Sequence, residues 1–314
     1  MNVSPKEFDA LQLKHNLQAV PCNLCGAWAA EELHPERDGI ARLDANDLFA
    51  CTSSAYGHCG PIVRCLGCGL VRQSPQPQPA DLVRAYREVA DERYEEEASG
   101  RVETFGRALR DLARHEPTGR LLDVGCHTGI FLEVARRAGW EACGVEPSRW
   151  SADRARARGL QVVDGTLAAA ELPEGSFDVV TMWDVVEHLA DPLAELRRAR
   201  RLLRPGGLLA LSTMNVEAWF PRLLGRRWPW YMQMHLYYFT PRTLGRMLER
   251  AGFRMVEAVP HRRVVRLAYL VSRLEAYCRP LARGLEWLVE RAGQSDRLVA
   301  VDLGDIFVTF ARRN

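Results

Sequence analysis

Residues 121–129, Leu-Leu-Asp-Val-Gly-Cys-His-Thr-Gly, constrain the fold of this chain more than any other segment. An apolar stretch typical of a buried strand runs into a glycine turn, and residues 130–138 then have the pattern of a helix. A second apolar stretch follows and ends on an acid, Glu146. In open α/β sheets this order of elements forms a crevice that binds nucleosides. The segment therefore predicts a site for a small cofactor that contains adenosine.

Strand and helix patterns continue to alternate after this segment. The expected strands cover residues 120–124, 141–145, 160–163, 177–182 and 207–212, and a last apolar strand, 306–311, closes the chain. Helical patterns lie between them, for example at 148–158 and 193–203. Short strands that alternate with helices predict an α/β fold with a doubly wound, mostly parallel sheet that has helices on both faces.

The spacing within the glycine turn excludes one class of ligand. A dinucleotide site has the pattern Gly-x-Gly-x-x-Gly, but the three corresponding positions here are Gly125, His127 and Ile130. A ligand without a pyrophosphate is therefore expected. Glu146 follows Gly125 by 21 residues, where a carboxylate can accept both hydroxyls of a ribose. The turn alone is also compatible with an ordinary strand–helix connection that binds nothing.

Four segments together resemble the class I S-adenosylmethionine-dependent methyltransferases: residues 121–129, 144–148, 175–189 and 202–207. The resemblance implies a Rossmann-like, seven-stranded sheet and S-adenosylmethionine as the cofactor. The residues implied as cofactor contacts are Asp123, Gly125 and Gly129 around the methionine, with Cys126 and His127 between them, Glu146 and Pro147 at the ribose, Gly165 and Thr166 at the adenine, and Trp183 and Asp184 beside the sulfonium.

Two of these residues leave alternatives open. Many members of that family have glycine where this chain has His127. Histidine is compatible with the backbone of such a turn, but its side chain would narrow the cofactor site. The ring of Trp183 suits a desolvated sulfonium cation, yet a buried aromatic residue at the end of a strand is an equally good interpretation.

Two cysteine pairs predict a structural zinc site near the N-terminus. Cys22 and Cys25 form one Cys-x-x-Cys-Gly motif, and Cys65 and Cys68 form the second. Two such pairs supply four thiolates for a closed tetrahedral site, which leaves no position for chemistry. The other cysteines of this region, Cys51 and Cys59, with His58, are irregularly spaced and are expected to be thiols rather than ligands of a second metal.

The expected domains follow from these motifs. Residues 1–79 form a zinc-ribbon domain that ends in a Pro-rich linker, residues 80–118 a helical connector, and residues 119–314 the methyltransferase domain. That domain includes an aromatic insertion at 214–240, expected to form the acceptor site, and a helical segment at 264–292. A zinc ribbon before a methyltransferase resembles a bacterial subfamily that often modifies sugars, sugar nucleotides, glycans or secondary metabolites. The resemblance thus implies a small-molecule acceptor.

His188 and His235 are the candidate catalytic bases. His188 lies just after the strand at 177–182, and His235 lies in the aromatic insertion. Histidine titrates near neutral pH and can accept a proton from an acceptor hydroxyl. In some related enzymes that make quinones, the segment that contains His188 helps to hold a metal. Asp184, Glu187 and His188 are therefore an alternative set of metal ligands. For each histidine, a cap or packing role is the competing interpretation.

Composition limits the partners. The net charge is +2, and residues 21–72 have no dense basic stripe, so no nucleic acid partner is expected. No secretory signal and no long apolar run is present, which predicts a cytoplasmic protein without a transmembrane segment. The segment at 264–292 is expected to be a solvated helix packed on its own domain; contact with a membrane surface or with a second subunit is the alternative, so a homodimer stays among the expected assemblies. An RNA-modifying methyltransferase and a non-catalytic binding protein with this fold are the alternative functions.

Overall fold

A computed structural model describes residues 16–36 and 45–314 of the chain. Residues 1–15 and 37–44, which belong to the expected zinc-ribbon domain, lie outside the described residues. Within the described part, no helix is both long and apolar enough to cross a bilayer.

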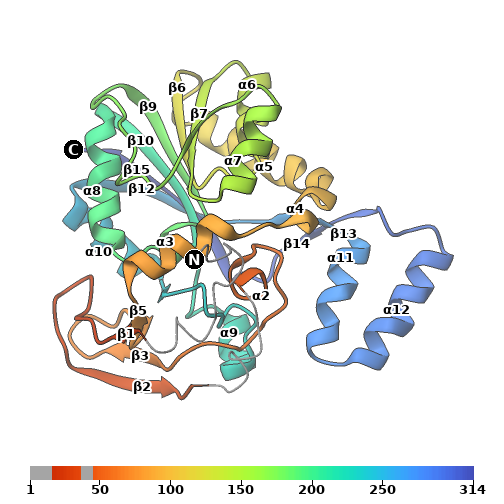
Figure 1. Cartoon of the computed structure of the whole chain (residues 1–314). Helices are drawn as coiled ribbons and strands as arrows, with labels where there is room; N and C mark the ends of the chain where they lie inside the picture. The colour runs from red at the N-terminus through yellow and green to blue at the C-terminus, as the bar shows by residue number, and fades with distance from the viewer. Residues whose placement is uncertain (1–15, 37–44) are drawn as a thin grey trace, which may run out of the picture.

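A seven-stranded sheet forms the centre of the molecule (Figure 1). Its order is β12-β15-β10-β9-β6-β7-β8, and β15 is antiparallel to both of its neighbours while the other pairs are parallel. This confirms the predicted mostly parallel, Rossmann-like α/β sheet. The strands are β6 (Arg120–Val124), β7 (Glu141–Glu146), β8 (Gln161–Asp164), β9 (Phe177–Trp183), β10 (Leu203–Met214), β12 (Phe253–Pro260) and β15 (Ile306–Arg313).

The strand order reverses at β6. The chain runs outward from β6 through β7 to β8 and then returns to β9 on the other side of β6. Ligands of open α/β sheets bind at this reversal, beyond the carboxyl ends of the strands. The turn at 125–129 lies there, so the topology places the predicted crevice where a ligand would bind.

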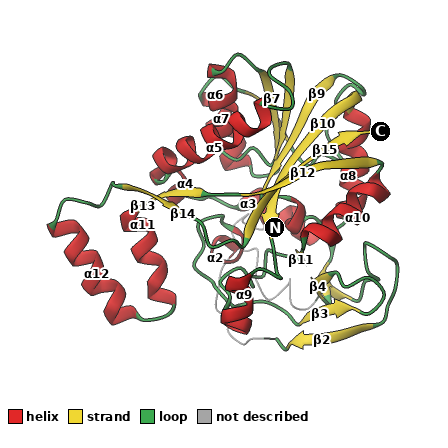
Figure 2. Ribbon diagram, turned by 180° about the vertical axis from the view of Figure 1, so that it is seen from behind, coloured by secondary structure: helices red, strands yellow, loops and turns green. Residues whose placement is uncertain are grey.

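Helices cover both faces of the sheet (Figure 2). Side chains of α5 (Ala98–Ala113), α6 (Ile130–Arg137) and α7 (Arg149–Ala157) share one apolar cluster with Leu121. Side chains of α8 (Pro192–Leu202) and α10 (Pro241–Ala251) share another with Leu122. Successive residues of a strand point to opposite faces, so the apolar run at the start of β6 supplies both cores.

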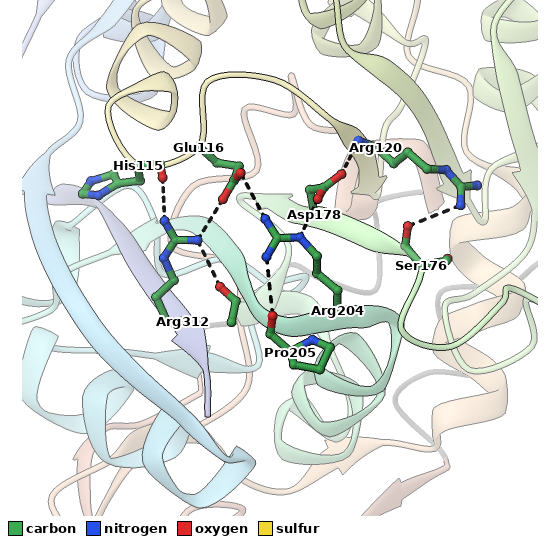
Figure 3. A network of polar contacts seen from close by, with 9 residues as sticks. His115, Glu116, Arg120, Ser176, Asp178, Arg204, Pro205 and Arg312 are labelled. Atoms are coloured by element: carbon green, nitrogen blue, oxygen red, sulfur yellow. Dashed lines mark hydrogen bonds and ion pairs between the residues drawn. The ribbon is translucent and has the colours of Figure 1, made fainter.

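Charged side chains link the strands at the end of the sheet away from the turn (Figure 3). Glu116 accepts from Arg204 at 3.1 Å and from Arg312 at 2.9 Å, and the Asp178 carboxylate accepts from the backbone N–H of Arg120 at 2.7 Å. Burial alone would raise the pKa of Asp178, but the Arg204 guanidinium holds that pKa below its usual value. This network therefore holds the scaffold and not the ligand crevice.

The N-terminal region and the aromatic insertion form one small sheet of order β11-β4-β3-β2. Strand β11 (Tyr237–Tyr238) comes from the insertion, and its partner β4 (Val71–Gln73) comes from the N-terminal region with β3 (Ile62–Cys65) and β2 (Ala30–His34). The insertion also contains α9 (Trp219–Leu224) and the short 3-10 helix η3 (Gly225–Arg227). The two segments, which are far apart in sequence, therefore pack as one unit.

The Pro-rich segment expected as a linker is instead packed into this unit. Its short strand β5 (Gln76–Pro77) is buried and pairs with β1 (Leu17–Gln18). Just before it, the buried Gln73 side chain donates to the backbone oxygens of Met232 and His235, at 2.9 and 2.7 Å. Prolines lack a donor, and a free polyproline stretch would be solvated, but here glutamine side chains supply the tertiary hydrogen bonds.

Helices follow the Pro-rich segment, as expected for residues 80–118. They are α3 (Pro79–Glu88), α4 (Glu92–Glu96) and α5, while the short α2 (Ala45–Phe49) precedes them. Asp91 caps α4, because its side chain accepts from the backbone N–H of Tyr94.

For the segment at 264–292 the sequence predicts a long amphipathic helical pattern that could break at Pro280, and the structure differs from this pattern at its start. It begins with strand β13 (Arg263–Arg266), which pairs antiparallel with β14 (Leu298–Val301), and the helices are α11 (Leu267–Ser272), the 3-10 helix η4 (Arg273–Ala276) and α12 (Arg279–Arg291). Pairing of Arg263–Arg266 with the distant strand Leu298–Val301 decides the conformation of these first residues, which a local pattern does not reveal. The helical hairpin projects from the rest of the molecule (Figures 1 and 2).

Candidate functional site

A cavity of about 520 Å³ opens beyond the carboxyl ends of β6, β7 and β9. Its volume is in the range usual for small-molecule and cofactor sites. Eight of the eleven expected cofactor contacts line it, namely Gly125, His127, Glu146, Pro147, Gly165, Thr166, Trp183 and Asp184. The candidate bases His188 and His235 line the same cavity. One space therefore contains both the expected cofactor residues and the expected acceptor residues.

The other three expected contacts, Asp123, Cys126 and Gly129, lie behind the turn and do not line the cavity. Asp123 points to β9, where its carboxylate accepts from the Thr181 hydroxyl at 2.6 Å. The Cys126 thiol packs beside Gly144, at which an added Cβ would lie 2.4 Å from the sulfur. Direct contact of these three residues with the cofactor therefore stays a prediction.

Gly125 shapes the turn at the edge of the cavity. Its φ is +71°, and an added Cβ would lie 2.8 Å from a methyl group of Val185. Its N–H donates to the Val145 oxygen at 2.8 Å, which ties the turn to β7. Only glycine combines this left-handed backbone with so little room.

Glu146 is buried at the end of β7, and both of its carboxylate oxygens accept backbone hydrogen bonds. The N–H groups of His127 and Ser148 donate to them, each at 2.8 Å. Burial raises the pKa of Glu146 to about 7, against the opposing effect of these two donors. Each oxygen keeps a further acceptor position, so the carboxylate is fixed in place and can receive ligand hydroxyls.

His127 occupies the turn with a left-handed backbone, at φ +49°. Its ring stacks on that of Tyr94, with 3.6 Å between centroids, and its buried Nδ1 has no hydrogen-bond partner. Burial, with the charge of Arg101, lowers the pKa of His127 well below its usual value. The imidazole is therefore neutral and has an unused nitrogen.

Arg101 is a residue of this site that the sequence did not single out. Its guanidinium lies 3.6 Å from the ring centre of Tyr94 and lines the cavity. Its Nε is buried without a hydrogen-bond partner, and among the described residues it forms no ion pair. The chain has many arginines and only the tertiary contacts separate this one from the rest. A partly buried cation with an unused donor suits an anionic ligand group.

Trp183 and Asp184 end β9 at the edge of the cavity. The Asp184 carboxylate accepts from the Ser212 hydroxyl at 2.8 Å and from Arg263 at 2.6 Å. Burial alone would raise the pKa of Asp184, but Arg263, His261 and Ser212 together hold it below its usual value. Arg263 therefore offsets the charge of Asp184, and the nearly buried ring of Trp183 is the feature of this end of the cavity that favours a cation.

His188 and His235 lie together, with 4.8 Å between ring centres. His188 belongs to the 3-10 helix η2 (Val186–His188), and its Nδ1 is 2.9 Å from the Tyr86 hydroxyl and 3.1 Å from the Met234 oxygen. The Nδ1 of His235 is 2.7 Å from the Trp230 oxygen. Burial lowers the pKa of His188 to about 4 and that of His235 to about 3, so both are neutral at pH 7.

Glu187 joins this pair. One of its oxygens accepts from the Thr213 hydroxyl at 2.9 Å, and the other is buried without a partner. Burial and the charge of Asp184 raise the pKa of Glu187 to about 8. One ligand atom each from Glu187, His188 and His235 lie within 4.8 Å of one another, a set that fits a divalent cation. Asp184, expected in this set, is paired with Arg263 instead.

The four cysteines of the two pairs come together as expected. The Sγ atoms of Cys22 and Cys68 are 3.4 Å apart, as are those of Cys25 and Cys65. All four lie within 4.8 Å of one another, close to the spacing of a tetrahedral zinc–thiolate site. Gly26 and Gly69, which follow the pairs, have φ of +78° and +80° and close the two loops.

Comparison with known proteins agrees with this geometry. The sequence model of a family described as a methyltransferase domain matches residues 91–258, more than half of the chain. The chain belongs to this methyltransferase family. The match covers the turn, Glu146 and the end of β9, so the chain carries an S-adenosylmethionine-dependent methyltransferase domain.

Curated relatives share this region. A ubiquinone biosynthesis O-methyltransferase of Ruegeria pomeroyi is 36% identical over 163 residues, which are 47% of this chain and 66% of the relative. One of Xanthomonas campestris is 40% identical over 107 residues, 32% of this chain and 44% of the relative. The chain thus spans about half to two thirds of the length of these relatives. A methyltransferase structure from Thermotoga maritima is 22% identical, covers 71% of this chain and 94% of that one, and has a TM-score of 0.49.

Proposed function

We propose that this protein transfers a methyl group from S-adenosylmethionine to an oxygen or carbon of a small-molecule acceptor. The observation that carries the proposal is that one cavity contains both sets of expected residues. Glu146, from the expected cofactor site, and His235, from the aromatic insertion, both line it. Cofactor and acceptor can therefore meet in one cavity, where the protein would orient them for reaction.

The cofactor position follows from the charges of the cavity. Glu146 would accept the ribose hydroxyls, and Gly165 and Thr166, which follow β8, would approach the adenine. The sulfonium would lie between Trp183 and Asp184. Arg101 would bind the methionine carboxylate, because it is the cation of the cavity with unused donors beside the turn.

The chemistry is an in-line displacement. The acceptor oxygen attacks the methyl carbon, the bond from carbon to sulfur breaks, and the electron pair returns to the sulfur to leave S-adenosylhomocysteine. The hydroxyl proton needs an acceptor. His235 would donate its Nδ1–H to the Trp230 oxygen, which leaves the lone pair on Nε2 for that proton.

A divalent cation is the alternative to a histidine base at the same place, because both roles would use Nε2 of His235, whose Nδ1 contacts the Trp230 oxygen. The unpartnered oxygen of Glu187 and the two neutral imidazoles of His188 and His235 fit a cation of intermediate softness. Such a cation supplies Lewis acidity that orients an acceptor hydroxyl and makes it more acidic. The carboxylate and imidazoles would hold it, and Thr213 would orient Glu187.

The acceptor end is mostly apolar. Trp230, Met232, Met234, Tyr56 and Phe49 line it. Among the acceptors expected from the sequence, which are sugars, glycans and secondary metabolites, a flat apolar metabolite with a hydroxyl suits these side chains best. The names of the curated relatives, which refer to O-methylation in ubiquinone biosynthesis, support an acceptor of this size and kind.

The domain arrangement supports a lid role for the N-terminal region. We propose that residues 1–79 and the insertion at 214–240 act as one acceptor-binding unit, because β4 and β11 pair and Gln73 joins them. The four cysteines would hold a structural zinc ion that keeps this unit folded.

Two measurements test the proposal. Isothermal titration with S-adenosylhomocysteine should show binding to the folded, zinc-loaded chain, and mass spectrometry of a hydroxylated metabolite library should show a product heavier by one methylene. His235→Ala should reduce turnover while leaving S-adenosylhomocysteine binding nearly unchanged, since its side chain lies at the acceptor end. If S-adenosylhomocysteine does not bind, the proposed function is wrong. If the methylated product is RNA and not a small molecule, the proposed acceptor is wrong.

A further inference from the structure

A second cluster of ligand-type side chains lines the cavity beside the turn. Cys51, Asp91 and His127 each offer one ligand atom, and these atoms lie within 4.8 Å of one another. They come from three separate segments, after α2, before α4 and after β6. Cys51 and His127 line the cavity, so the cluster is reached from the space that would hold the cofactor.

The chemistry of the three side chains suits one cation. A thiolate, a carboxylate oxygen and a neutral imidazole nitrogen are ligands of zinc, with bond lengths of about 2.0–2.3 Å. Ligand atoms within 4.8 Å of one another need only small side-chain movements to reach one ion. Zinc binds cysteine as the thiolate, so the cation would displace the proton of the Cys51 thiol.

A second observation, on His127, also indicates a bound ligand at this cluster. Its side chain is 9% exposed, its Nδ1 is buried without a hydrogen-bond partner, and the residue adopts a backbone conformation that costs free energy for a side chain larger than glycine. Asp91 accepts from the Thr52 N–H at 3.0 Å, from the Thr52 hydroxyl and from the Tyr94 N–H at 3.2 Å, which leaves about one of the four acceptor positions of a carboxylate. Capacity for a cation therefore remains on both residues.

We propose that Cys51, Asp91 and His127 bind a divalent cation of the zinc type, separate from the four-cysteine site. Three protein ligands leave one position open. Because Cys51 and His127 line the cavity, a ligand from the cavity would fill that position: water, or a carboxylate or amine of a bound small molecule. The site depends on neither the proposed methyl transfer nor the cation proposed for Glu187.

Metal content of the purified full-length chain tests this site. Elemental analysis after growth with zinc should show about one zinc ion less per chain in His127→Gly and in Cys51→Ala than in the wild type. Glycine accepts a left-handed backbone, so His127→Gly is expected to fold. Cys278→Ala is the matched control, because Cys278 is exposed and belongs to no ligand cluster among the described residues.

The test compares the zinc content of each variant with that of the wild type, and the total zinc content does not decide it. Equal zinc content in wild type, His127→Gly and Cys51→Ala would overturn the proposal, whatever the occupancy of the four-cysteine site. If one of these variants does not fold, as judged by circular dichroism, the other decides. Protection of Cys51 from alkylation by zinc, lost after chelation, gives an independent readout, and its absence would also count against the site.

Discussion

Replacement of Glu146 by glutamine should weaken cofactor binding far more than folding. The carboxylate accepts from two backbone N–H groups, and each of its oxygens would accept one ribose hydroxyl. In Glu146→Gln one oxygen becomes an NH₂ group, so one hydrogen bond to a charged acceptor is lost, about 1.5–3 kcal/mol. This corresponds to roughly a 10- to 100-fold rise in the dissociation constant of S-adenosylhomocysteine.

The cost to folding should be smaller. The new NH₂ faces one of the backbone donors, which costs about 1–3 kcal/mol for an unsatisfied group. Removal of a buried charge, shown by the raised pKa of Glu146, offsets part of this cost. The free energy of unfolding should therefore fall by less than about 2 kcal/mol.

Isothermal titration and denaturant unfolding of three proteins would measure both effects. Glu141→Gln is the matched control, since Glu141 begins the same strand β7, is largely exposed and should change neither quantity. Binding to Glu146→Gln within about threefold of the wild type would refute the ribose assignment. Wild-type affinity should also fall as the pH drops below about 7, because bound hydroxyls favour the ionised carboxylate.

Three further outcomes follow from the structure. Arg101→Gln should raise the dissociation constant of S-adenosylhomocysteine roughly 10- to 100-fold by loss of a charged hydrogen bond; Arg107→Gln, on the exposed part of the same helix, should not, and equal effects would argue against a carboxylate contact. Burial raises the pKa of Asp123 to about 8, so the folded state favours the protonated form and stability should fall as pH rises from about 4 to 8. Asp123→Asn should reduce that slope in denaturant unfolding, with cofactor affinity nearly unchanged; an unchanged slope would contradict the buried carboxyl. Removal of metal by a chelator, or Cys25→Ser, should lower the thermal midpoint together with the zinc content, and an unaltered midpoint would exclude a structural ion.

Local sequence patterns were sufficient for the central fold. Strand β6, the turn and Glu146 could be predicted because each depends on residues next to one another: apolar runs, glycines with left-handed backbone and a carboxylate at a strand end. The cysteine pairs are equally local, since two residues between thiols and a following glycine define each loop. These features need no knowledge of distant contacts.

The sequence pattern did not determine which way the side chains of these elements point. Asp123 matched a cofactor motif, but its register opposite Thr181 turns it into the sheet. The start of β13 looked helical until pairing with β14 decided otherwise. Register and pairing depend on contacts between segments far apart in the chain, which outweigh local propensity.

The sequence by itself therefore determined the layered α/β sheet, the turn at its centre and the two cysteine pairs, because short-range spacing carries that information. Only the tertiary structure decided which further side chains meet at the cavity. Arg101 lines it, and the ligand atoms of Cys51, Asp91 and His127 come together from separate segments, although neighbouring residues give no sign of either arrangement. The physical reason is that packing of the covering unit on the sheet brings these charges and ligand atoms together.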